Sequence, residues 1–450
     1  MTLPWVQRAH LTLRRHGGFG ALAQRLARIL DREGWGGLRY RWRHLLHGDQ
    51  GGVTKRPGVS LAQIRANPED VAKFRANLPP GALLVGHPYA ILGRAEDIRT
   101  AAQALQTAQV PFAMRNVLGD YGRQWTHLHP DFPLLERIDT RSTFRANIHV
   151  LNANEMEMAW QHQGEALFRA PYNIGYWAWE LSHFPNAWLP ALALLDEIWA
   201  PSRFIQQAIA EKTDLPVTWM PLAVEPTLAA PGSRADLGLP DGRFLFLFFF
   251  DFRSYLSRKN PWAVIQAFTR AFSPADHGVG LVIKTNGMEE SQPAYQEFAR
   301  SPLLDDPRII LIDRVMDDRE IKSLVNHCDC FVSLHRAEGF GRGLAEAMFM
   351  GKPVIATGYS GNLDFMNSDN SCLVDYHLIP VGEHEYPFGS GQYWAEPDIG
   401  MAADWMRALA SDPALAAEIG QAGAATIRRH HSFAAVGTRY RRRLEQLHLL

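Results

Sequence analysis

Short apolar runs alternate with segments of helical periodicity along most of the chain. The first series predicts strands at residues 83–85, 148–152, 172–177 and 197–200, and helices at residues 98–105 and 188–195. Alternation of this kind is typical of a parallel sheet with helices on both faces. The proline-containing stretch at residues 216–226 is interpreted as a crossing between two domains.

A second alternation begins at residue 244. Its first apolar run, residues 244–250, lies between Arg243 and Asp251 and has the length of a strand buried on both faces. Further strands are predicted at residues 280–284, 309–312, 330–334 and 353–356, and helices at residues 261–272, 318–327 and 343–350. Two doubly wound halves in one chain place a ligand cleft between the carboxyl ends of both sheets.

The predicted fold class is therefore α/β, with two Rossmann-like doubly wound domains that face a central cleft. The predicted boundaries are residues 1–58 for a basic helical extension and linker, 59–225 for the N-terminal domain and 226–432 for the C-terminal domain. Residues 433–450 form a basic helix that is expected to brace the two lobes.

The extension at residues 1–58 is strongly basic and has apolar residues at helical spacing. Its arginines outnumber its few acidic residues, and Leu22, Leu26, Ile29 and Leu30 fall on one helical face. Two interpretations stay open: peripheral contact with anionic lipid or a membrane-bound partner, or a helix packed on the protein's own lobe. Residues 48–58 are typical of a linker.

Composition limits the function classes. The chain has 450 residues, a net charge of −1 and 46% hydrophobic residues, which gives no reason to expect a nucleic-acid partner. Three cysteines cannot form a disulfide framework or a four-thiolate zinc site. With neither a signal peptide nor an apolar stretch of membrane-spanning length in the sequence, we expect a cytoplasmic protein.

The sharpest chemical signal is the segment at residues 333–346. An apolar strand ends at Leu334, a glycine-rich loop carries Glu338, and a helix begins near Gly343. Loop glycines allow a ligand close to the backbone, and the start of a helix suits a diphosphate. A carboxylate at Glu338 can accept hydrogen bonds from a sugar, and Glu346, one turn into the helix, can hold both hydroxyls of a ribose.

Positive charge is expected close to these carboxylates. Arg253 and Lys259 follow the buried strand at residues 244–250, at the carboxyl end of the same sheet. Fixed cations there would stabilise the negative charge that develops on a leaving diphosphate, without a metal.

This constellation resembles family 4 of the GT-B glycosyltransferases, whose hallmark is a Glu-x7-Glu pair that follows an Arg/Lys pair. Glu338 and Glu346 match that spacing, as do the basic pair above and the segments at residues 258–268 and 351–362. The resemblance implies a metal-independent hexosyltransferase that acts with retention of anomeric configuration. The catalytic residues that it implies are Glu338, Arg253 and Lys259. The donor-binding residues that it implies are Glu346, Gly341, Arg342, Gly343, Leu344 and Gly93.

The N-terminal half is similar to a polysaccharide-assembly branch of the same family. The segments at residues 173–180 and 196–202 carry this similarity, and Glu180, Trp179 and Asn154 are its implied acceptor or sugar contacts. Two positions depart from the branch: Ala95 stands where relatives often have a second loop glycine, and asparagines stand near a strand end where many have a histidine.

The resemblance implies transfer of a sugar from a nucleotide-diphosphate sugar to a glycan or lipid-linked acceptor in surface polysaccharide biosynthesis, with no cofactor and no metal. Such an enzyme would act in the cytoplasm at the inner face of the membrane. Two alternatives remain at this point. One is another GT-B enzyme, a sugar-nucleotide epimerase or a phosphorylase. The other is a non-catalytic partner in a polysaccharide-assembly complex.

Overall fold

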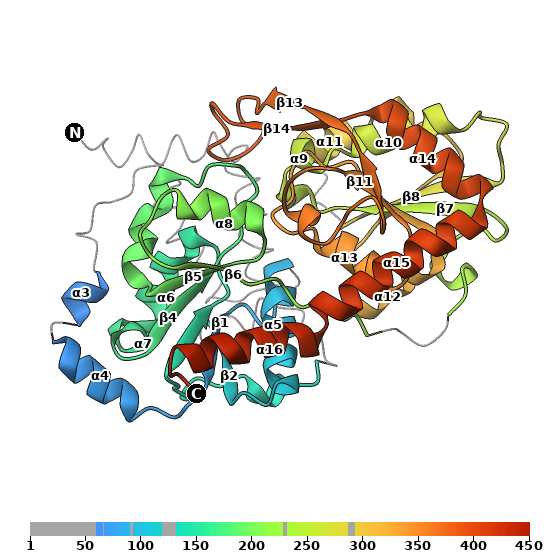
Figure 1. Cartoon of the computed structure of the whole chain (residues 1–450). Coiled ribbons are helices and arrows are strands. Elements are labelled where there is room, and N and C mark those ends of the chain that lie inside the picture. Colours follow the sequence, from blue (N-terminus) through green and yellow to red (C-terminus); the bar gives the residue numbers. More distant parts are fainter. Residues whose placement is uncertain (1–59, 66, 91–92, 119–131, 228–231, 287–292) are drawn as a thin grey trace, which may run out of the picture.

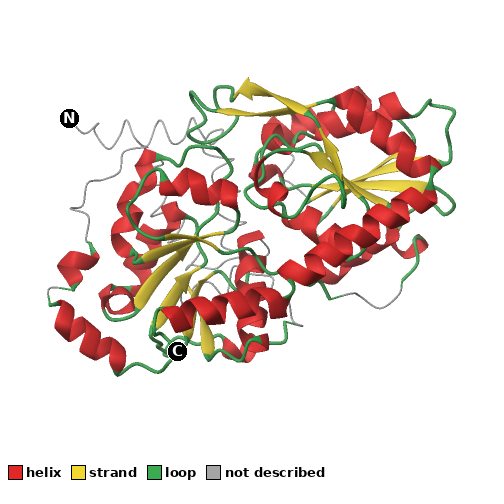
Figure 2. Cartoon of the chain, viewed as in Figure 1, coloured by secondary structure: helices red, strands yellow, loops and turns green. Residues whose placement is uncertain are grey.

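The apolar runs form two separate parallel sheets, and each sheet is covered by helices on both faces (Figures 1 and 2). The computed structural model describes residues 60–65, 67–90, 93–118, 132–227, 232–286 and 293–450. The predicted basic helix within residues 1–47 lies outside the described residues. The predicted α/β fold class, with two Rossmann-like domains, is confirmed.

The N-terminal sheet has six parallel strands in the order β2-β1-β3-β4-β5-β6. They are β1 (Ala82–Gly86), β2 (Phe112–Asn116), β3 (Ala146–His149), β4 (Tyr172–Tyr176), β5 (Glu197–Ala200) and β6 (Val217–Trp219). The helices of this domain are α3 (Leu61–Ile64), α4 (Pro68–Ala76), α5 (Gly93–Thr107), α6 (Met156–Gln163), α7 (Glu165–Arg169) and α8 (Arg203–Ala210). β6 begins inside the segment that was predicted to be a crossing, so the crossing itself starts after Trp219.

The C-terminal sheet also has six strands, in the order β12-β11-β10-β7-β8-β9. They are β7 (Phe244–Phe249), β8 (Val279–Thr285), β9 (Ile309–Asp313), β10 (Cys330–Ser333), β11 (Val354–Thr357) and β12 (Cys372–Val374). The helices are α9 (Leu256–Lys259), α10 (Pro261–Ala271), α11 (Pro293–Ala299), α12 (Asp318–His327), α13 (Arg342–Phe349), α14 (Ile399–Ser411) and α15 (Pro413–His431). A strand order that runs outward in both directions from β7 and β10 is that of the dinucleotide-binding domains.

Local sequence explains where key helices begin. Asp317 caps α12 by accepting a hydrogen bond from the backbone N–H of Glu320, whose side chain in turn accepts one from the N–H of Asp317. The predicted helix at residues 188–195 forms instead as a 3-10 segment, Asn186–Leu194, with Pro190 inside it. Proline removes a backbone donor and disfavours a regular α-helix there.

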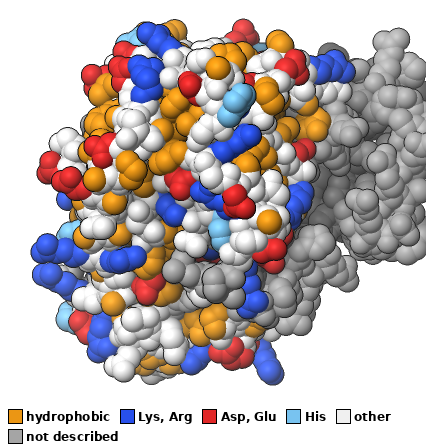
Figure 3. Space-filling view, turned by 90° about the vertical axis from the view of Figure 1, so that its right-hand side faces the viewer, with side chains coloured by type: hydrophobic (Ala, Val, Ile, Leu, Met, Phe, Trp, Pro, Cys, Tyr) orange, Lys and Arg blue, Asp and Glu red, His pale blue; other side chains and the backbone are white. Residues whose placement is uncertain are grey.

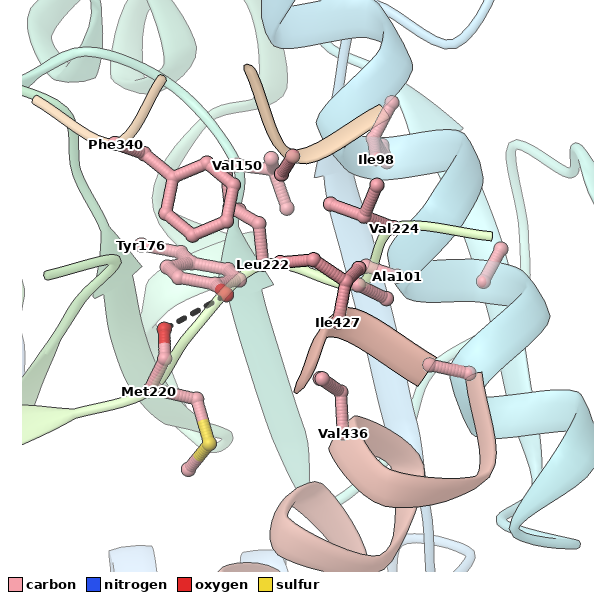
Figure 4. Packing of buried hydrophobic residues seen from close by; sticks show 14 of the residues in the cluster. Ile98, Ala101, Val150, Tyr176, Met220, Leu222, Val224, Phe340, Ile427 and Val436 are labelled. Carbon is pink, nitrogen blue, oxygen red and sulfur yellow. Dashed lines mark hydrogen bonds between the residues drawn. The ribbon is translucent and has the colours of Figure 1, made fainter. Parts of the chain in front are cut away.

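The chain crosses between the lobes twice, and the two crossings are bonded to each other. After β6 the chain passes into the C-terminal domain, and after α15 it returns so that the final helix, α16 (Phe433–Gln446), packs on α5 (Figure 1). The N–H of Val224 on the first crossing donates to the carbonyl of His431 on the second at 2.7 Å. Val224 and Leu222 pack there with Ile427, Phe340 and Tyr176, so one apolar core joins the lobes (Figure 4).

An antiparallel hairpin extends from the C-terminal domain beside the sheet. It consists of β13 (Tyr376–Pro380) and β14 (Tyr393–Pro397). Its connecting loop reaches the N-terminal lobe, where Gln392 accepts a hydrogen bond from the N–H of His183 at 2.9 Å.

The face of the C-terminal domain that points away from the N-terminal lobe carries acidic and basic side chains interspersed with hydrophobic ones. This face therefore has no extended patch of positive or of negative charge (Figure 3).

Candidate functional site

The site lies where the strand order of the C-terminal sheet reverses. β7 and β10 are neighbours, and the chain winds outward from them in opposite directions. Loops that leave the carboxyl ends of two such strands separate, and ligands of doubly wound folds bind in that opening. The loop after β7 carries the basic residues at positions 253–259, and the loop after β10 carries Glu338.

Glu338 is held by two cations from the β7 side. Its Oε1 bonds to the ammonium of Lys259 and lies 3.3 Å from Nη1 of Arg258, and the Glu338 side chain is only 12% exposed. Burial alone would raise the pKa of Glu338, but Lys259, Arg258 and His335 lower it to about 2. Glu338 is therefore ionised at neutral pH and can accept hydrogen bonds.

The backbone of the Glu338 loop is fixed by close contacts. Ser360 accepts a hydrogen bond from the N–H of Glu338 at 2.9 Å, and the N–H of Gly361 donates to the carbonyl of Glu338 at 2.9 Å. A Cβ on Gly361 would lie 1.9 Å from the carbonyl oxygen of Gly339, so only glycine permits this approach. The carboxylate thus projects from a loop that has little freedom to move.

Helix α13 begins at the same place, directly on the sheet. Gly341 precedes it with a φ of 92°, and no side chain caps this end. A Cβ on Gly343 would lie 2.9 Å from the ring of Phe249 in β7, so glycine lets the helix approach the strand. The first N–H groups of a helix lack partners within it, and together with the helix dipole they favour an anion. Leu344 is buried, so only its backbone can contribute to such a site.

Glu346 is buried beneath this helix start and has a cation of its own. Nζ of Lys322, on α12, lies 2.7 Å from Oε2 of Glu346, and the two side chains are 4% and 7% exposed. Burial raises the pKa of Glu346, and the nearby Glu96 acts in the same direction, while Lys322 and Arg342 oppose them. The two glutamates of the predicted pair therefore occupy separate, charge-compensated positions along one loop and helix.

Arg342 reaches across to the N-terminal lobe. Its guanidinium donates two hydrogen bonds to Oδ1 of Asp97 on α5, at 2.5 and 3.0 Å, and another to the carbonyl of Ala223 at 3.3 Å. Asp97 also accepts from Arg94 at 2.6 Å. Gly93, one of the expected donor-binding residues, begins α5 in an exposed position with open space around its missing side chain. The starts of α5 and α13 thus lie close together.

Of the two cations predicted to face the leaving group, the structure brings only Lys259 to Glu338. Arg253 is 66% exposed, and its Nε lies 3.6 Å from Oδ1 of Asp251. Arg258 stands against Glu338 instead, almost fully buried, and donates to the carbonyl of Ala337 at 2.9 Å. Arg258 directly precedes Lys259, and this position was the one sequence feature that could have indicated a role for it. The sequence of a loop does not show which of two neighbouring side chains points towards Glu338.

The predicted acceptor residues occupy three different environments. Oε2 of Glu180 accepts a hydrogen bond from the hydroxyl of Tyr386, on the hairpin loop, at 2.6 Å, and the charge of Glu180 acts on Arg258 and Lys259. Trp179 is 1% exposed, and its ring packs against Phe184, Trp188 and Tyr386, which leaves no open ring face for a sugar. Asn154 is exposed in the short 3-10 turn after β3.

A histidine–carboxylate pair, missed by the sequence analysis, lies at the equivalent position of the N-terminal sheet. The strand order reverses between β1 and β3. Nε2 of His87, just after β1, lies 2.9 Å from Oε1 of Glu155, which follows β3. The two residues are far apart in the sequence, and only the parallel pairing of β1 with β3 brings them together.

Two observations concern metals and membranes. Among the residues that the structure describes, no three His, Cys, Asp or Glu side chains group in a way that could hold a metal ion. In the same part of the chain, each helix is too short or too polar to cross a bilayer.

Comparison with known proteins identifies the C-terminal lobe. Residues 245–380 match the family described as glycosyl transferases group 1. This part of the chain is similar to glycosyltransferase domains. It contains Arg258, Lys259, Lys322, Glu338 and Glu346. A search of curated protein sequences finds no match for the chain.

Solved structures of glycosyltransferases share the whole two-lobed fold. HepE of Anabaena, in complex with UDP and glucose, aligns with a TM-score of 0.60 at 13% identity over 82% of this chain and 100% of its own. Sucrose-phosphate synthase of Thermosynechococcus elongatus aligns with a TM-score of 0.58 at 14% identity, over 82% and 99%. A glycosyltransferase of Rickettsia africae gives 0.57 at 14% identity, over 82% and 98%. The chain therefore has the GT-B fold.

Proposed function

We propose that the protein is a retaining hexosyltransferase that transfers a sugar from a nucleotide-diphosphate sugar to a glycan or lipid-linked acceptor in surface polysaccharide biosynthesis. The observation that carries the proposal is the pair Glu338 and Glu346, which follow β10 in its loop and in α13. Each carboxylate lies against its own lysine, Lys259 for Glu338 and Lys322 for Glu346. The match of residues 245–380 to a glycosyltransferase family supports it.

Each charged group has a role in this proposal. Glu346 accepts hydrogen bonds from the ribose hydroxyls, and Glu338 accepts them from the transferred sugar. The N–H groups at residues 341–344 and the cations Lys259, Arg258 and Arg253 hold the diphosphate, whose negative charge grows as the glycosidic bond breaks. Fixed charges need no reorganisation during the reaction, so they stabilise the transition state more than the bound donor.

The proposed transfer needs no side chain that acts as a general base. The bond between the anomeric carbon and the diphosphate oxygen breaks, and the acceptor oxygen forms its bond to the same carbon from the same face. The acceptor proton passes to the departing phosphate oxygen. Glu180 lies between the lobes, beside Tyr386 and in the field of Arg258, where it can accept a hydrogen bond from the acceptor. Positioning and charge stabilisation supply the rate.

The proposal also covers the acceptor and the place in the cell where the transfer occurs. A lipid-linked acceptor at the inner face of the membrane would be reached through contact of the basic extension, residues 1–58, with anionic lipid. The donor lobe needs no membrane contact for nucleotide binding. Donor and acceptor functions can therefore be tested separately.

The first test is thermal stability against a panel of nucleotide-diphosphate sugars, with UDP-glucose included because HepE has been solved with it. A ligand that binds only the native state raises stability by RT ln(1 + [L]/Kd), so a true donor stands out from the panel. We expect one donor to raise Tm in the presence of EDTA and the shift to disappear in Glu346→Ala. Absence of a shift with every donor would contradict the donor site.

Turnover distinguishes the proposal from its alternatives. With donor and a glycan acceptor, nuclear magnetic resonance of the product should show the anomeric configuration of the donor. Conversion of the donor in the absence of any acceptor other than water or phosphate would instead indicate an epimerase or a phosphorylase.

A further inference from the structure

Lys322 is a buried lysine that takes part neither in the hydrogen bonding of the sheet nor in the hydrophobic core. It lies on α12, at the face that meets α13, and its residue is only 3% exposed. Its ammonium contacts Oε2 of Glu346 at 2.7 Å and Oδ1 of Asp318 at 3.3 Å. Burial of an ammonium group is costly unless the charge is paired, so this lysine is present for its partner.

The partner is the carboxylate that the proposed function assigns to the ribose. The charged groups that face Glu346 are Lys322 on α12, Arg342 on α13 and Glu96 on α5. Asp318 is a second carboxylate beside the ammonium of Lys322, at 3.3 Å. Glu96 and burial both favour the protonated form of Glu346, and Arg342 is already engaged in two hydrogen bonds with Asp97. Among the described residues, Lys322 is the cation in direct contact with this carboxylate.

Protonation states follow from these neighbours. Burial lowers the pKa of Lys322, but Glu346, Asp318 and Glu96 raise it more, so the ammonium stays charged. Burial raises the pKa of Glu346, and without Lys322 the rise would be larger because only Arg342 would oppose it. A protonated carboxyl group carries an O–H donor on one oxygen, and it accepts hydrogen bonds more weakly than a carboxylate.

We propose that Lys322 is a positioning residue of the nucleotide site, which holds one oxygen of Glu346 and keeps the carboxylate ionised so that it accepts both ribose hydroxyls. The inference rests on the proposed donor site and adds to it the residue that orients Glu346 and keeps it charged for binding of the ribose. Lys322 touches Glu346 and not the reacting atoms, so its effect belongs to binding and to selection of ribose over deoxyribose.

The test compares each nucleoside diphosphate with its 2′-deoxy analogue by titration calorimetry. The probes are UDP, GDP, ADP and CDP, and the one that binds tightest is carried forward. In the wild type, loss of a hydrogen bond to a charged group should weaken binding about tenfold. In Lys322→Met the ratio of the two affinities should fall towards one, because binding of the ribose form is lost and binding of the deoxy form is largely kept.

A matched control is available between the same two helices. Lys352, in the turn after α13, donates to the carbonyl of Asn326 near the end of α12 at 2.6 Å, away from Glu346. Lys352→Met should retain the selectivity of the wild type, and Lys322→Arg, which keeps the charge, should restore most of it. If Lys322→Met does not fold by circular dichroism, Lys322→Gln, which keeps a donor but loses the charge, takes its place.

The pH dependence gives a readout that loss of structure would not produce. In Lys322→Met, selectivity for ribose should return as the pH rises, because Glu346 ionises again, and the wild type should gain its selectivity at a lower pH than this variant. The diphosphate titrates alike in both ligands, so the affinity ratio removes its contribution.

The outcomes separate the two proposals. If Lys322→Met keeps full selectivity for ribose, or if its affinity falls equally for both ligands, the inference is overturned and the proposed donor site is unaffected. No selectivity in the wild type would overturn the inference and the ribose role of Glu346. No binding of any nucleoside diphosphate to the wild type would overturn the inference and the proposed function together.

Discussion

Three carboxylates with little exposure to solvent at the junction of the lobes each have two cationic neighbours. Glu338 lies against Lys259 and Arg258, and Asp97 lies against Arg94 and Arg342. Glu346 has Lys322 in contact and Arg342 nearby. Removal of water from a carboxylate costs several kcal/mol, and paired charges with good geometry offset that cost. A single neutralising substitution would therefore leave an uncompensated charge.

At this scale we predict the effect of Glu338→Gln on acid stability. The pKa of Glu338 in the folded protein, about 2, lies below the usual value of 4.5 for this carboxyl group. Its stabilising contribution is therefore complete above about pH 5 and is lost as the pH falls towards 2. Glu338→Gln should cost on the order of 2 kcal/mol at pH 7, and the difference from the wild type should shrink between pH 5 and 3.5 in urea unfolding. Glu418→Gln, at an exposed position of α15, is the control, and a difference that does not change with pH would contradict the assignment.

Glycine sets how closely helices approach their neighbours. In α16, a Cβ on Gly437 would lie 2.2 Å from the carbonyl oxygen of Ala104 in α5. In α15, a Cβ on Gly420 would lie 2.1 Å from the carbonyl of Gly351, which follows α13. Both contacts involve backbone atoms, which cannot move aside as a flexible side chain can. The last two helices of the chain are thus fitted closely, one to each lobe.

At the scale of elements we predict that Gly437→Ala separates α16 from α5. The added methyl group should destabilise the protein by about 2 kcal/mol, even though alanine favours a helix. Thermal unfolding should show a lower Tm for Gly437→Ala than for Arg442→Ala, a substitution at an exposed position of the same helix. Equal Tm values would show that α16 adjusts its position without cost.

The two lobes are in direct contact around the site. Besides the two crossings, Asp97 bonds to Arg342, Tyr386 bonds to Glu180, and Ser202 donates to the carbonyl of Gly339 at 2.5 Å. Each bond links one lobe to the loop after β10, to the start of α13 or to the hairpin. Relative motion of the lobes would have to break these bonds, and it would uncover the charged groups of the site.

At the scale of the whole molecule we predict that Asp97→Asn weakens closure of the lobes. Arg342 and Arg94 would lose their shared counter-charge, and the two hydrogen bonds that Arg342 donates to Oδ1 across the lobes would weaken because the acceptor is no longer an anion. Small-angle scattering should show a larger radius of gyration for Asp97→Asn than for the wild type. Glu165→Gln, which alters an exposed ion pair within α7, should leave it unchanged. Identical radii for Asp97→Asn and the wild type would mean that the crossings alone set the arrangement.

The sequence by itself determined most strands of the two parallel sheets, the two-domain plan and the edge of the sheet where Glu338 and Glu346 lie. It could do so because these features depend on local patterns: an apolar run such as residues 244–250, or a glycine-rich loop between a strand and a helix. Weak local patterns were missed. Strand β2 contains Arg115 and Asn116, and β6 has three residues within a proline-bounded stretch.

The tertiary structure decided which side chains meet. Arg258 rather than Arg253 reaches Glu338, because side-chain direction in a loop depends on what packs around it. Lys322 meets Glu346 only because α12 packs beside α13, and Asp97 meets Arg342 across 245 positions of the chain. Contacts of this kind follow from strand order and helix packing, in which residues distant in sequence share one edge of a sheet. Local periodicity carries no information about such partners.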